Sequence, residues 1–145
     1  MDDERTNQDK LEVEFNGSCL CGGVTFTLEG RFESFYLCHC SRCQKGTGSL
    51  YGANLFSNNL VLNWRRGEAL LKTYQVPNTR HKRCFCKVCG SPMPYRLEAL
   101  NLVVVPAGSL DVEVPIAPTA RLFMAELANW GEKLQSVPGF ELLPE

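Results

Sequence analysis

The stretch GSCLCGGVTFTL, residues 17–28, decides the fold because it joins a cysteine-rich turn to a strand. Apolar and polar side chains alternate over residues 24–28, as they do in a strand with one face in the core. The same alternation occurs over residues 11–15. Cys19 and Cys21 therefore lie in the bend between two strands, and the glycines around them give the backbone the freedom that a tight turn requires.

Strand-like segments dominate the rest of the chain. They are short apolar runs separated by turn residues, and they cover residues 50–56, 60–64, 69–74 and 102–105. Many short strands with frequent turns predict a mainly β fold, a small antiparallel domain. Helices are expected at two places: a short turn over residues 41–45, capped by Ser41, and a weaker pattern over residues 123–130.

The chain has 145 residues, of which 44% are hydrophobic and 21% charged, the usual size and composition of one globular domain. We expect a mobile polar tail over residues 1–10 and a single zinc-bearing domain over residues 11–145. The formal net charge of -1 gives no global positive field for a polyanion, so no nucleic-acid partner is expected. Nothing in the pattern specifies the oligomeric state.

The first ten residues are acidic and polar and lack the apolar segment of a signal peptide. The longest apolar runs are far too short to span a bilayer. We therefore expect a cytoplasmic protein without a membrane partner. Because thiols stay reduced in that compartment, the eight cysteines are better explained as metal ligands than as four disulfides of an exported protein.

The eight cysteines fall into three tight groups, Cys19-x-Cys21, Cys38-x-Cys40-x-x-Cys43 and Cys84-x-Cys86-x-x-Cys89. Four thiolates around a tetrahedral ion are typical of zinc, and a Cys-x-x-Cys turn supplies two of them with little strain. The first group, joined to Cys86 and Cys89, completes a site with four sulfur ligands. Such a site is saturated, so we predict that it is structural.

The middle group differs, since Cys38, Cys40 and Cys43 place three donors within six residues. Three protein ligands and one exchangeable position are the arrangement of a catalytic zinc. Cys84 leaves three alternatives open: it can complete this second site, approach the first, or remain a buried free thiol, which is a common state for cysteine. The expected cofactor is zinc, with two ions per chain.

Three stretches, GSCLCGGVTFTLEG, CHCSRCQKGTGSLYGANLF and RCFCKVCGSPM, closely resemble the glutathione-dependent formaldehyde-activating family, which also includes centromere protein V. The segment FMAELANWGEKLQSVPGFE resembles that family's ending. The resemblance implies a β-tent fold related to methionine-R-sulfoxide reductases, two zinc ions and a glutathione adduct as ligand. By position, it implies a structural zinc on Cys19, Cys21, Cys86 and Cys89, and an exchangeable, catalytic zinc on Cys38, Cys40 and Cys43.

A thiol that enters the exchangeable position loses its proton, because zinc coordination lowers the thiol pKa. The thiolate can then attack an aldehyde carbon, and the reverse reaction breaks the same carbon–sulfur bond. We therefore expect a zinc-dependent carbon–sulfur lyase that forms or cleaves an adduct of glutathione, or another small thiol, with formaldehyde or a similar aldehyde. The alternative is a non-catalytic binding module that uses zinc only to fold.

Candidate substrate contacts lie near the middle group. Glutathione carries two carboxylates, and Arg42 and Lys45 are within or just beyond the three-cysteine loop, although solvated loop charges are the equal alternative. His39 can carry a proton, but its ring should point away from the metal in an extended Cys-x-Cys segment.

Two further groups have a simpler interpretation. The basic cluster at residues 80–83 is interpreted as the wet face of a strand rather than as a nucleic-acid site. Some aromatic residues are candidates for a ligand groove, although core positions are commoner for them: Tyr51, Phe56, Trp64, Tyr74 and Trp130.

Overall fold

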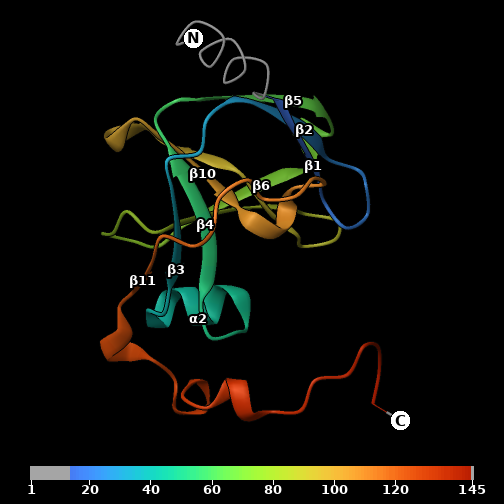
Figure 1. The fold of residues 1–145 in the computed structure, drawn as a ribbon. Coiled ribbons are helices and arrows are strands. Elements are labelled where there is room, and N and C mark those ends of the chain that lie inside the picture. The colour runs from blue at the N-terminus through green and yellow to red at the C-terminus, as the bar shows by residue number, and fades with distance from the viewer. Residues whose placement is uncertain (1–13, 145) are drawn as a thin grey trace, which may run out of the picture.

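The computed structural model describes residues 14–144 and shows a mainly β protein (Figure 1). The described residues contain one α-helix, α2 (Ser41–Thr47), and several short 3-10 turns. Every strand pairing is antiparallel except that of β11 (Ala120–Leu122) with β3 (Ser34–Cys38), which is parallel. The predicted mainly β, antiparallel architecture is confirmed, while the relation to methionine-R-sulfoxide reductases stays a prediction.

The strands form three sheets. The first has the order β1-β2-β5 and consists of β1 (Glu14–Ser18), β2 (Thr25–Gly30) and β5 (Leu60–Arg66). The second has the order β11-β3-β4-β10-β9 and adds β4 (Gly52–Ser57), β10 (Leu102–Pro106) and β9 (Tyr95–Leu97). The third has the order β6-β7-β8 and consists of β6 (Leu71–Gln75), β7 (Lys82–Cys86) and β8 (Pro92–Met93).

Most predicted strands are present. The segments predicted over residues 24–28, 50–56, 60–64 and 102–105 correspond to β2, β4, β5 and β10, with ends that differ by at most two residues. The strand predicted over residues 69–74 begins only at Leu71, because Gly67 (φ 76°) starts a 3-10 turn before it. The tail predicted over residues 1–10, and residues 11–13 of the first predicted strand, lie outside the described residues.

Both predicted helices need correction. The prediction of a helix over residues 123–130 is wrong. Two separate 3-10 turns begin in this segment, because Phe123 has a left-handed backbone (φ 56°) and Ala128 is extended. Neither conformation can continue an α-helical hydrogen-bond ladder. The helix over residues 41–45 is present as α2, but Cys40, and not Ser41, occupies its N-cap position.

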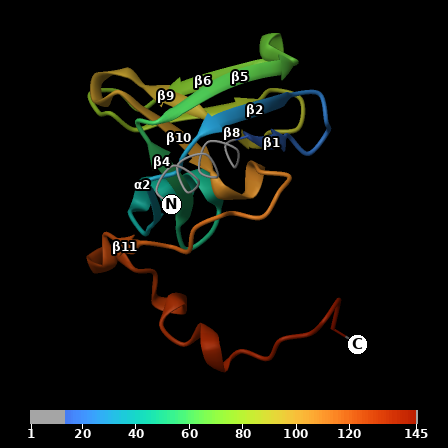
Figure 2. The same ribbon diagram turned by 45° about the horizontal axis from the view of Figure 1, so that its top comes forward.

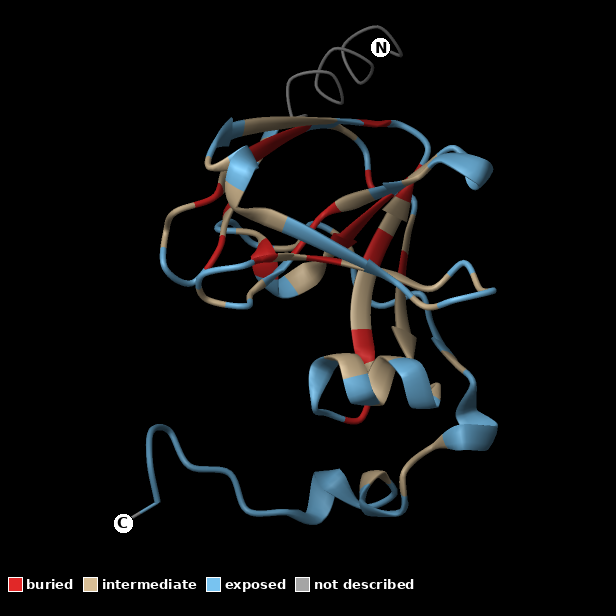
Figure 3. Cartoon of the chain, turned by 180° about the vertical axis from the view of Figure 1, so that it is seen from behind, coloured by how far each residue is buried: buried red, intermediate tan, exposed pale blue. Residues whose placement is uncertain are grey.

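A hydrophobic core joins the sheets. Phe26 and Leu28 of β2, Leu55 of β4 and Val105 of β10 are almost completely buried and belong to one cluster. Buried segments gather where the sheets meet, whereas the chain after β11 is largely exposed (Figure 3). That C-terminal segment leaves the sheets and passes beyond α2 (Figures 1 and 2). None of the helices within residues 14–144 is both long and apolar enough to cross a membrane.

Candidate functional site

The fold brings two groups of cysteine sulfurs together. The first, which we call the clamp, consists of Cys19, Cys21, Cys86 and Cys89, whose Sγ atoms all lie within 4.8 Å of one another. The Cys21 Sγ is 3.6 Å from that of Cys19 and 3.9 Å from that of Cys86. A tetrahedral zinc with Zn–S bonds of ~2.3 Å separates its sulfurs by about 3.8 Å. The clamp therefore fits such an ion.

The clamp joins two turns that are far apart in the sequence. In the first turn, between β1 and β2, the Cys19 N–H donates to the Val24 carbonyl at 3.1 Å. In the second, after β7, the Gly90 N–H donates to the Cys86 carbonyl at 2.7 Å, and Gly90 has the left-handed φ of 78° that glycine adopts without a Cβ clash. Because β1 and β7 belong to different sheets, a metal in the clamp would fasten the first sheet to the third.

Ser91 favours the ionised form of one clamp thiol. Its hydroxyl lies 3.3 Å from the Cys89 sulfur. This hydrogen bond, followed by one from the Ser91 backbone, lowers the pKa of Cys89 to about 5. The lowered pKa of Cys89 favours its thiolate, which is the protonation state that a metal ligand requires.

The second set, the three-cysteine group, consists of Cys38, Cys40 and Cys43. Cys38 ends β3, Cys40 caps α2, and Cys43 lies in the first turn of α2. Their sulfurs also lie within 4.8 Å of one another, and each residue is half-buried. The Cys43 N–H donates to the Cys40 Sγ at 3.4 Å, so the helix cap and the metal-binding geometry are the same local structure.

The donor set of this group favours a cation. Burial, followed by the neighbouring sulfurs of Cys40 and Cys38, raises the pKa of Cys43 well above its usual range. Burial also raises the pKa of Cys38. Three adjacent thiolates repel one another, so they cannot all ionise at neutral pH unless a positive ion offsets their charge. Zinc with sulfur ligands meets that requirement.

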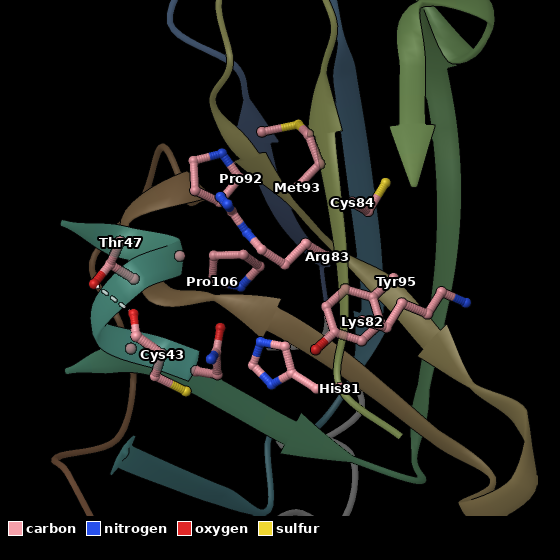
Figure 4. A pocket seen from close by; sticks show the side chains of 13 residues that line it. Cys43, Thr47, His81, Lys82, Arg83, Cys84, Pro92, Met93, Tyr95 and Pro106 are labelled. Carbon is pink, nitrogen blue, oxygen red and sulfur yellow. Dashed lines mark hydrogen bonds between the residues drawn. The ribbon is translucent and has the colours of Figure 1, made fainter. Parts of the chain in front are cut away.

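Cys84 lies apart from both groups. It is buried in β7, where burial raises the pKa of its thiol. Cys43 and Cys84 line opposite sides of a small cavity of about 70 Å³, and the Cys84 sulfur points away from Cys43 (Figure 4). Among residues 14–144, the second group therefore has three members, and Cys84 occupies the core as a thiol.

A cavity of about 470 Å³ adjoins the three-cysteine group. Its size is that of a site for a small organic molecule. Side chains from α2, four strands of the second sheet, the segment before β7 and the C-terminal segment line it. They comprise all three cysteines together with Tyr36, Ser41, Arg42, Asn54, Phe56, Arg80, His81, Tyr95, Leu97, Leu122, Phe123 and Glu126.

One part of the cavity wall is cationic. Arg42 of α2 lines it, as predicted for a substrate anchor, and Arg80 lines it from the segment before β7. Lys45 is exposed in the last turn of α2 and is outside the set of lining residues. His81 lines the cavity next to Arg80, and burial, followed by the charges of Arg42 and Arg83, lowers its pKa. The lowered pKa favours the neutral form of the His81 ring.

The sequence did not predict that Arg80 and His81, two residues of the basic cluster at 80–83, line this cavity. The interpretation of this cluster as the wet face of a strand is wrong for His81, Lys82 and Arg83, which are half-buried. The one signal in the sequence was position, because the cluster directly precedes the third cysteine group. His39, in contrast, is buried beside Tyr51, with its Nδ1 3.2 Å from the Leu37 carbonyl oxygen, and does not line the cavity.

The C-terminal segment supplies another part of the wall and is held against α2. The Ser41 N–H donates to the Glu126 carboxylate at 3.1 Å. The Gln44 side-chain amide donates to the Glu126 carbonyl at 3.0 Å and to the His39 carbonyl at 2.7 Å. These bonds, which we call the latch, fix Leu122 and Phe123 at the cavity.

A larger cavity of about 710 Å³ lies beside the clamp. Asp111 is the one lining residue that carries a formal charge, and its carboxylate accepts a hydrogen bond from Ser18. A carboxylate wall disfavours an anionic thiol such as glutathione. The cavity at the three-cysteine group also has a carboxylate, that of Glu126, but it has two arginines as well, so its formal charge suits an anion better.

A β fold that gathers cysteine sulfurs into two groups that could each hold a metal ion, with an arginine-lined cavity beside the three-cysteine group, is the class of protein that the structure defines. The sequence profile of the family described as glutathione-dependent formaldehyde-activating enzyme matches residues 14–126. The chain belongs to this family, as the resemblance of its cysteine motifs predicted.

Among solved structures, the chain is similar to the crystal structure of a Rhodobacter sphaeroides protein, with 24% sequence identity and a TM-score of 0.52. The similarity covers 73% of this chain and 98% of that one. No curated protein matches the sequence. The structural similarity shows a shared fold, and the family assignment rests on the sequence profile.

Proposed function

We propose that the protein binds a small thiol, in the first place glutathione, at a zinc ion in the three-cysteine group, and forms or cleaves its adduct with formaldehyde or a similar aldehyde. It would then be a zinc-dependent carbon–sulfur lyase, acting in the cytoplasm, where thiols stay reduced. One observation carries the proposal: the described residues gather three cysteines, and not four, at a cavity of about 470 Å³.

The cysteines that would bind metal fall into two separate sets. Cys19, Cys21, Cys86 and Cys89 would hold one zinc, and the three-cysteine group would hold the other. When bound in the second set, zinc supplies one property, a lower pKa for an incoming thiol, so that the thiol is held as a thiolate.

Arg42 and Arg80 give the cavity its selectivity for an anionic thiol. Both are arginines, whose planar guanidinium groups bind carboxylates through paired hydrogen bonds. They come from different segments of the chain, so they can hold two carboxylates of one ligand. Binding at two points fixes the direction in which the thiol group lies, which raises the effective concentration of the reacting sulfur.

The reaction also requires a proton at the carbonyl oxygen. When the thiolate sulfur attacks the aldehyde carbon, a carbon–sulfur bond forms and the carbonyl electron pair moves to oxygen, which must be protonated. His81 and Tyr95 line the cavity beside Cys43. Burial, followed by Cys43, raises the pKa of Tyr95 to about 12, so its phenol keeps its proton at neutral pH and can donate it. Burial, followed by the charges of Arg42 and Arg83, lowers the pKa of His81, and the neutral imidazole that this favours can accept the proton in the reverse reaction.

X-ray absorption at the zinc edge tests the proposal. The protein loaded with two zinc ions should show an average of about 3.5 sulfur ligands per zinc, rising to about 4 when glutathione is added. Cys40→Ser is the matched control, because it removes one ligand of the second site and should abolish the response to glutathione. A shell of four sulfurs at both ions that does not change with glutathione would show a non-catalytic, zinc-stabilised binding module instead.

A further inference from the structure

The cavity at the three-cysteine group has an apolar part that the smallest aldehyde does not need. Tyr36 of β3, Phe56 of β4 and Phe123 of the C-terminal segment line it together with Leu97 and Leu122. Formaldehyde has no carbon substituent to place against such a wall. A thiol held by its carboxylates at Arg42 and Arg80 leaves this apolar surface for another part of the ligand.

Phe123 is held at the cavity in an unusual conformation. Its backbone is left-handed (φ 56°, ψ 44°), which is rare for a bulky residue and costs free energy. The surrounding hydrogen bonds maintain it: the His39 N–H donates to the Leu122 carbonyl at 2.9 Å, and the Glu126 N–H donates to the Phe123 carbonyl at 2.9 Å. Strained residues cluster at ligand-binding positions.

The Phe123 side chain remains 60% exposed although it lines the cavity. An exposed aromatic side chain gains free energy when a ligand covers it, because apolar surface is then removed from water. The latch, which ties Glu126 to α2, holds Phe123 in the wall of the cavity that the three cysteines also line.

We infer that the site acts on aldehydes that carry a hydrocarbon substituent of several carbons, and that Phe123 determines this specificity. The inference rests on the proposed function. The thiol sulfur, having lost its proton, forms a bond to the carbon of R–CHO, and the carbonyl oxygen gains a proton, so the product is a 1-hydroxyalkyl thioether and no oxidant or reductant is needed. The group R packs against Phe123, Phe56 and Tyr36, while the carboxylates of the thiol face the arginines.

S-alkylglutathiones provide the test, because they carry the hydrocarbon chain in a stable thioether. Calorimetric titration of the zinc-loaded protein with the S-methyl, S-propyl and S-hexyl compounds should give an affinity that rises about threefold for each added methylene until the wall is covered. Phe123→Ala should bind S-hexylglutathione about tenfold more weakly and S-methylglutathione almost unchanged. Phe123→Leu should retain most of the chain-length dependence.

Phe140→Ala is the matched control, since Phe140 is also 60% exposed and is outside the set of lining residues. It should leave the whole series unchanged. If wild-type affinity is flat or falls with chain length while glutathione still adds sulfur to zinc, the inference is overturned and the proposed function stands. If affinity rises with chain length but glutathione adds no sulfur to zinc, the proposed function fails, and the inference fails with it as a statement about the reaction.

Discussion

The backbone N–H of Cys43 donates a hydrogen bond to the sulfur of Cys40 at 3.4 Å, so one member of the three-cysteine group caps the helix that carries another. Capping normally falls to serine, threonine, aspartate or asparagine. Here the geometry that aligns the two sulfurs is fixed by a short helix and not by the metal alone, which gives the three-cysteine group a preformed shape.

Cys40→Ser should separate metal binding from folding. Serine is a good N-cap, so α2 should form and the free energy of unfolding should change by less than about 1 kcal/mol. The zinc content should nevertheless fall from two ions per chain to one, since a sulfur ligand is lost. Zinc analysis together with thermal melting checks both parts, and a variant that keeps two ions would contradict the assignment.

Cys86→Ser should have a far larger effect on folding. Cys86 is completely buried and belongs to the clamp, where the binding energy of the metal is also folding energy. We expect a loss of several kcal/mol, or no folded protein, in thermal and urea melts. Equal destabilisation by Cys86→Ser and Cys40→Ser would refute the division between a structural and an exchangeable site.

Cys84→Ala should leave both zinc ions in place. The side chain is buried in the core outside both sulfur groups, so its loss removes packing and leaves a small cavity. The expected cost is about 1 kcal/mol, with two ions retained in the zinc analysis. A fall to one ion would make Cys84 a ligand.

Tyr95→Phe should reduce the loss of stability in alkali. Burial, followed by Cys43, raises the pKa of Tyr95 from 10.0 to about 12, so the folded state favours the neutral phenol. That contribution is complete below pH 10 and is lost as the pH rises towards 12. Urea melts over this range should show the wild type losing about 1–2 kcal/mol more than the variant. Identical pH profiles would contradict the raised pKa.

Gly17→Ala should unfold or severely destabilise the protein. A Cβ atom at Gly17 would overlap the Phe26 ring, which is buried and cannot move aside. The expected cost is about 3 kcal/mol. Gly108→Ala is the control, since a Cβ there meets nothing within 4 Å, and it should change the melting temperature little.

The sequence predicted local features well because their signals are local. Alternating side chains located β2, a short apolar run located β4, and the spacing of Cys38, Cys40 and Cys43 identified a group whose members lie within six residues. The pairing of the clamp turns was also correct, because their sulfurs had few alternative partners.

The cavity could not be predicted in the same way. Arg80, His81 and Phe123 reach it from segments that only the completed sheets bring next to α2. The left-handed backbone of Phe123 follows directly on Leu122, whose carbonyl accepts a hydrogen bond from the distant His39, so a weak helical pattern over residues 123–130 could not reveal it. Cys40, and not Ser41, is the cap because its backbone is still extended and its sulfur accepts the hydrogen bond from the Cys43 N–H.

The two sulfur groups differ in when they can form as the chain is synthesised. The three-cysteine group is complete once residues 38–43 are free to fold, whereas the clamp must wait for Cys89 to meet Cys19. Because synthesis proceeds from the N-terminus, the local group is assembled first and the clamp closes late. Closure of the clamp therefore comes only after the whole of the first sheet, and β6 and β7 of the third, have been synthesised.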